Sequence, residues 1–108
     1  MVDLAGGIPK YISLIHPKGV SRSENWVLDL AMLEQMVSEK TKAIILNNPN
    51  NPLGKVWHRD ELESLRKVII RHNLLCISDE VYEHLVYKPL DKGSTSEIYR
   101  YFNTGFRY

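Results

Sequence analysis

The sequence predicts an α/β fold, with a mainly parallel sheet between two layers of helices. Two continuous apolar runs, residues 43–46 and 74–77, are typical of buried strands. Between them, residues 59–72 carry apolar side chains at helical spacing. A strand–helix–strand unit makes its strands parallel through a right-handed crossover, and strands that are apolar throughout are covered on both faces. We therefore expect a three-layer αβα arrangement.

Two further elements are predicted before the first of these strands. Residues 11–15 form a short apolar run just after Pro9, which favours a strand. Residues 16–25 are polar and contain proline and glycine, so we expect a loop there. A helix is then predicted from an N-cap at Asp29 to about Glu39. Its core-facing stripe consists of Leu30, Leu33, Met36 and Val37.

The segment between the two strands begins as a stiff loop and continues as a helix. Residues 47–54 contain two prolines, each of which fixes its own φ and restricts the residue before it. His58 then occupies the expected N-cap, and the acidic residues after it suit the positive end of the helix dipole. Trp57 is placed to pack onto Leu62 across the start of the helix. The apolar stripe consists of Leu62, Leu65, Val68 and Ile69.

Composition limits the classes of function that are open to this chain. The 108 residues allow one domain, and 14 basic against 13 acidic side chains leave a net charge of +1. This low net charge gives no electrostatic attraction for nucleic acid or an anionic membrane, so we expect neither partner. The four histidines share no metal-ligand spacing, so we expect no metal site. With one cysteine and no signal-peptide pattern, the expected compartment is the cytoplasm.

Three polar side chains follow the two predicted strands. Asn51 lies in the loop after the first strand, Asp79 ends the second, and Tyr82 shares a face with Asp79 if a helical turn begins there. Ligands of such sheets bind beyond the carboxyl ends of the strands. A carboxylate, a phenol and an amide in a dry crevice would suit a heteroaromatic ring with a protonated nitrogen and a ring oxygen. Two simpler interpretations remain: Asp79 as a helix N-cap, and Tyr82 as a core side chain.

A nucleotide hydrolase is the main enzymatic alternative, because an apolar strand ending in Asp79 is similar to a Walker B segment. The matching phosphate-binding loop is not present. Gly54 and Lys55 are followed by Val56, where Ser or Thr is needed. Pro49 occupies the position of the first required glycine. These departures argue against a nucleotide hydrolase.

Two motifs resemble one family of enzymes. Asn-Pro-Asn-Asn-Pro-Leu-Gly-Lys at residues 48–55 and Ile-Ser-Asp-Glu-Val-Tyr-Glu at residues 77–83 resemble the large domain of fold-type I, class I/II pyridoxal-phosphate aminotransferases. The kynurenine aminotransferase and cysteine-S-conjugate β-lyase branch is the most similar. The resemblance implies that Asn51 and Tyr82 hydrogen-bond the phenolic oxygen of pyridoxal 5'-phosphate. It also implies that Asp79 pairs with the pyridine nitrogen of this cofactor.

The resemblance further implies an activity, its substrates and a homodimeric parent. The activity would be transfer of an amino group from an aromatic, kynurenine-like or sulfur-containing amino acid to a 2-oxo acid. The resemblance covers residues 1–89, a partial large domain, and residues 90–108 form a divergent tail. No lysine of this chain matches the family's Schiff-base lysine in its Ser-x-x-Lys context, so we expect the isolated chain to be inactive. The alternative is a non-catalytic remnant or interaction fragment that binds no cofactor.

Overall fold

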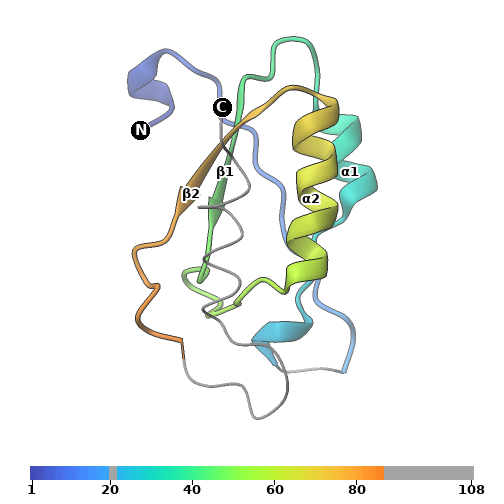
Figure 1. Ribbon diagram of the computed structural model, residues 1–108, viewed down its shortest axis with the longest axis vertical. Helices are drawn as coiled ribbons and strands as arrows, with labels where there is room; N and C mark the ends of the chain where they lie inside the picture. The colour runs from blue at the N-terminus through green and yellow to red at the C-terminus, as the bar shows by residue number, and fades with distance from the viewer. Residues whose placement is uncertain (20–21, 87–108) are drawn as a thin grey trace.

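A computed structural model describes residues 1–19 and 22–86, which form a two-stranded sheet with two helices on one side (Figure 1). The strands are β1 (Ala43–Asn47) and β2 (Leu75–Asp79). The helices are α1 (Leu30–Met36) and α2 (Arg59–Arg71), and α2 connects the two strands. Short 3-10 turns at Asp3–Ala5 and Ser23–Asn25 complete the described elements.

The two strands are parallel, as the sequence predicts. Their register pairs Ala43 with Leu75 at one end and Asn47 with Asp79 at the other. Both arrows in Figure 1 point toward the same end of the molecule, where the chain leaves β1 and returns to the start of α2. The carboxyl ends of the two strands therefore meet at one edge, and residues that follow either strand lie near each other there.

One face of this sheet is covered and the other is exposed. Ile44 and Leu46 point toward the core that the helices form with the sheet. On the opposite face, Ile45 is 48% exposed, Ile77 is 44% exposed and Leu75 is 50% exposed. The described residues thus build two layers of the expected αβα arrangement, the sheet and one layer of helices, and they leave the other face of the sheet uncovered. The apolar side chains on the outer face explain why the sequence predicted cover there.

Both predicted helices form, and both predicted N-caps are confirmed in position. The Asp29 carboxylate accepts the backbone N–H of Met32 at 2.9 Å, which begins α1. Helix α1 ends at Met36, before the predicted end at Glu39, and only Leu33 of its predicted stripe is fully buried. Helix α2 follows His58 as predicted. Its whole stripe is buried, together with Trp57: Leu62, Leu65, Val68 and Ile69.

The predicted strand at residues 11–15 does not form. A single antiparallel bridge joins Ile15 to Val27, with N–H···O distances of 2.8 and 3.0 Å. Among the described residues, no other backbone pairing extends this run into a strand, and Tyr11 at its start is 83% exposed. The predicted boundary at residue 89 and the tail at 90–108 lie outside the described residues.

Candidate functional site

Two asparagines at the end of β1 join the loop that follows to the end of β2. The side-chain oxygen of Asn47 accepts the backbone N–H of Asn51 at 2.7 Å. The same amide donates through Nδ2 to the backbone oxygen of Asp79 at 3.2 Å. The backbone N–H of Asn48 donates to that oxygen as well, at 2.9 Å. The loop is therefore held against the end of the neighbouring strand from its first residue.

The loop also closes on itself. The backbone N–H of Asn50 donates to the carbonyl of Lys55 at 2.8 Å, and the N–H of Gly54 donates back to Asn50 at 2.7 Å. Gly54 has φ +67°, a left-handed conformation that glycine adopts without steric cost. The peptide bonds before Pro49 and Pro52 are both cis. Asn51 thus lies within a loop whose two ends are hydrogen-bonded together.

The chain turns directly after β2 and brings Tyr82 to this loop. The N–H of Glu83 donates to Glu80, and the N–H of Leu85 donates to Tyr82, each at 2.9 Å. These bonds form turns where a helical turn was expected. The side-chain amide of Asn51 donates through Nδ2 to the phenol oxygen of Tyr82 at 3.0 Å. Asn51 and Tyr82 are separated by 31 residues in the sequence and are in direct contact in the structure.

Asp79 ends β2 and is paired in register with Asn47, whose side-chain amide bonds the backbone of both Asp79 and Asn51. One carboxylate oxygen accepts the backbone N–H of Val81 at 3.4 Å, a weak contact. No helix follows Asp79 in the described chain, so the N-cap interpretation fails. The residue is exposed, whereas we expected a dry crevice, because it extends from the sheet face that the described residues leave uncovered.

The three groups fit the chemistry of a protonated pyridine ring that carries an oxygen. One amide N–H of Asn51 is used on the phenol oxygen of Tyr82, which leaves the second amide N–H and the phenol O–H as donors. Both donors suit an oxygen that carries negative charge. The carboxylate of Asp79 suits a ring nitrogen that carries a proton. The partly buried phenol of Tyr82 has a specific polar partner, so it is more than a core side chain.

Sequence reasoning missed three residues that hold this site together. Asn47 makes the bridge described above. Asn48 is 1% exposed, and its side-chain oxygen accepts the N–H of Trp57 at 3.2 Å. Lys55 is 0% exposed. The signal that could have found the asparagines is their position directly after an apolar strand, but nothing in the sequence distinguishes a buried lysine from a solvated one.

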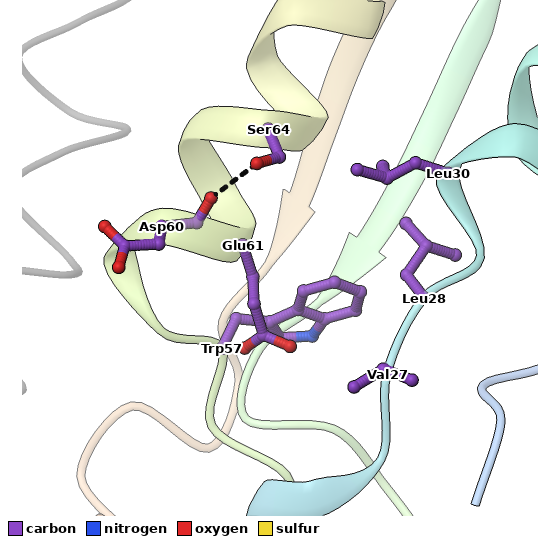
Figure 2. Close-up of a pocket in the computed structure, with 7 residues that line it drawn as sticks. All are labelled: Val27, Leu28, Leu30, Trp57, Asp60, Glu61 and Ser64. Atoms are coloured by element: carbon purple, nitrogen blue, oxygen red, sulfur yellow. Dashed lines mark hydrogen bonds between the residues drawn. The ribbon is translucent and has the colours of Figure 1, made fainter.

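A pocket of about 280 Å³ lies elsewhere, between the segment before α1 and the first turns of α2 (Figure 2). Trp57 forms one wall, and Asp60 and Glu61 lie at its side. None of the three predicted site residues lines this pocket. Within residues 1–19 and 22–86, no group of three or more potential ligands could hold a metal ion. The same residues include no helix long and apolar enough to cross a membrane.

A parallel α/β unit with donors and a carboxylate at its carboxyl strand ends belongs to a class of ligand-binding domains. Comparison with known proteins identifies the family. The model of the aminotransferase class I and II family matches residues 2–104. Human kynurenine–oxoglutarate transaminase 3 is 50% identical over 91 residues, which are 81% of this chain and 20% of that protein. The chain belongs to the aminotransferase class I and II family.

Solved structures agree with this assignment. The crystal structure of Bna3p from Saccharomyces cerevisiae superposes with a TM-score of 0.76 at 39% identity, over 87% of this chain and 23% of that one. Cystalysin from Treponema denticola, whose structure contains pyridoxal 5'-phosphate, gives a TM-score of 0.63 at 26% identity. That match covers 79% of this chain and 21% of cystalysin. The chain spans about a fifth of the length of the relatives it matches.

Proposed function

We propose that this chain provides one side of a pyridoxal 5'-phosphate site in a transaminase. The parent enzyme would transfer an amino group from an aromatic, kynurenine-like or sulfur-containing amino acid to a 2-oxo acid. The observation that carries the proposal is the hydrogen bond between Asn51 and Tyr82 at the carboxyl ends of two parallel strands, the second of which ends at Asp79. The similarity to human kynurenine–oxoglutarate transaminase 3 supports the choice of substrates.

Each of the three residues has a distinct task in this proposal. The cofactor, when bound, supplies an electron sink for the electrons released as the amino acid loses its α-proton. Asp79 holds a proton on the ring nitrogen, because a nearby negative charge favours the protonated form. Asn51 and Tyr82 donate hydrogen bonds to the ring oxygen and stabilise negative charge there.

Asn51 has a second task, because it also orients Tyr82. Its Nδ2 donor occupies one lone pair of the phenol oxygen, so the phenol proton is directed away from Asn51. The phenol O–H and the second amide N–H then remain free to donate to one acceptor. A site with prearranged donors needs no reorganisation when charge develops, which is the main way that proteins stabilise such charge.

We also propose that the parent is a cytoplasmic homodimer without nucleic-acid or membrane partners. The near-neutral net charge of +1 supports the absence of polyanion binding. The unpaired cysteine supports a reducing compartment. The exposed apolar side chains of the outer sheet face support association with further protein surface.

The proposal is tested by binding, because the chain covers about a fifth of its relatives. Pyridoxamine 5'-phosphate is the suitable probe: it has the same ring but no aldehyde to react with lysines. We expect its fluorescence to report saturable binding to the purified chain. Asp79→Asn, Asn51→Ala and Tyr82→Phe should each weaken binding about tenfold, the effect of losing one well-placed polar contact.

Lys67→Met is the control, because Lys67 is exposed on α2 and makes no contact with the three residues. It should bind the probe like the original chain. If the chain shows no saturable binding, the alternative of a remnant that binds no cofactor is favoured. If the chain binds and all three site variants bind as well as the control, these residues do not form the site and the proposal is wrong.

A further inference from the structure

A buried lysine lies behind the loop that carries Asn51. Lys55 is fully buried, and its ammonium contacts both carboxylate oxygens of Glu61, at 2.9 and 3.0 Å. It also donates to the backbone oxygen of Glu24 at 3.3 Å. The ammonium lies 5.4 Å from the ring centroid of Trp57. One side chain therefore links the loop to α2 and to the turn at Ser23–Asn25.

Burying an ammonium group is costly, even when the group is paired. The loss of hydration often exceeds what the ion pair returns, so a buried pair is poor evidence for a stabilising role. Buried polar contacts do restrict the arrangements that a chain can adopt, because alternatives would leave the charge without a partner. The three polar contacts of the ammonium and the nearby ring specify one position for Lys55.

The same residue fixes the loop through its backbone. The carbonyl oxygen of Lys55 accepts the N–H of Asn50, the residue directly before Asn51. The carboxylate that pairs with Lys55 also accepts the backbone N–H of His58 at 2.8 Å and so caps α2. The position of Asn51 is thus connected to the start of α2 through Lys55 and Glu61.

We propose that Lys55 is a positioning residue for Asn51: its buried ion pair with Glu61 fixes the loop so that the Asn51 amide meets Tyr82. The value of this arrangement for ligand binding rests on the proposed cofactor site. The contact between Asn51 and Tyr82 can be measured without any ligand, so the inference and the proposed function can fail separately.

The first test measures this contact directly by NMR in the full chain. Lys55→Met keeps the length of the side chain and removes its charge. We expect the side-chain amide resonances of Asn51 to move toward the values of a free asparagine. We also expect the backbone amide of Asn50 to exchange about tenfold faster with solvent, because the bond to residue 55 loosens. Lys67→Met is the matched control and should change neither signal.

Two further variants separate positioning from charge balance and from general destabilisation. Lys55→Met with Glu61→Gln removes both charges, so no unpaired carboxylate remains. If this double variant restores the Asn51 signals fully, Lys55 only neutralises Glu61 and the proposal is wrong. Lys55→Arg keeps a cation for Glu61 and should restore part of the signal. Spectra are compared under conditions where circular dichroism shows every variant to be folded.

The second test uses pyridoxamine 5'-phosphate. Lys55→Met should bind it about tenfold more weakly than the original chain, with the Lys67→Met control unchanged. Unaltered binding together with unaltered Asn51 resonances would overturn the inference. If the original chain itself does not bind the probe, the proposed function fails, and the NMR result alone decides the role of Lys55.

Discussion

Asn48 and Asn51 lie three residues apart in one loop and have opposite surroundings. Asn48 is buried, and its oxygen satisfies the backbone N–H of Trp57. Asn51 is exposed, and its amide contacts Tyr82. Residues of the same type in the same motif thus have different roles: Asn48 supports the fold, whereas we propose that Asn51 presents a donor to the cofactor.

This contrast predicts different effects of the same substitution. Asn48→Ala leaves the buried N–H of Trp57 without an acceptor, so we expect a loss of about 1–3 kcal/mol in the free energy of unfolding. Asn51→Ala removes an exposed contact and should change the free energy of unfolding by less than about 0.5 kcal/mol. Urea unfolding of both variants gives the comparison. Equal losses would show that the loop does not depend on Asn48 in this way.

Cys76 faces the packed side of β2 and is partly buried there. Burial raises the pKa of its thiol, because the charged thiolate loses solvation. Less thiolate is then present at neutral pH, and we expect the folded chain to react with a disulfide reagent much more slowly than the urea-unfolded chain. Thiol titration with time measures this difference. A rate in the folded chain equal to that of a free cysteine would contradict the buried placement.

At the scale of elements, a cluster of charges joins α1 to α2. The Glu34 carboxylate contacts the guanidinium of Arg71 and lies 2.7 Å from the ring nitrogen of His72. The hydrogen bond with His72 is the main effect that lowers the pKa of Glu34 below its ordinary value of 4.5. Burial opposes this shift, and the charge of Arg71 adds to it. The helices are therefore linked by a carboxylate that favours its ionised form in the folded chain.

The lowered pKa of Glu34 determines how the stability of the folded chain changes with pH. A carboxylate with a lower pKa in the folded chain stabilises it above pH 4.5, and that contribution is lost as pH falls through the folded-state value. Glu34→Gln should therefore be less stable than the original chain at neutral pH, and the gap should close in acid. Urea unfolding between pH 7 and 3 measures the gap. Glu39→Gln, at an exposed position, is the control and should leave the free energy of unfolding at pH 7 unchanged.

Elements that bury a continuous stripe were predictable, and elements that depend on distant partners were not. Helix α2 was predicted from His58 and its stripe because propensity, capping and apolar spacing all agree there. The predicted strand at residues 11–15 was wrong, because a strand needs a partner and, in the part of the chain that the structure describes, only Ile15 pairs, with Val27. The same distinction applies to the site. Sequence motifs predicted Asn51, Asp79 and Tyr82, whereas the contacts of Lys55 could not be predicted because they form only when separate segments fold together.

At the scale of the molecule, the two faces of the sheet differ in the described chain. Helices α1 and α2 cover one face of the sheet (Figure 1), and the other face exposes apolar side chains next to Asp79. Ile45 and Ile77 are paired in register there, so their side chains form one continuous surface. Among the described residues, β1 and β2 pair only with each other, which leaves backbone groups open at both edges. Exposed apolar faces and open edges both favour association.

We therefore expect the isolated chain to self-associate through this face as its concentration rises. Ile45→Lys together with Ile77→Lys should shift sedimentation toward the monomer, because two desolvated charges would oppose contact between copies. Stability should fall little, since both side chains are already nearly half exposed. Ile70→Lys is the matched control: Ile70 is 57% exposed, but it lies on α2. The control should sediment like the original chain. If the control abolishes association and the sheet variant does not, copies meet through the helical side and the open sheet face plays no part.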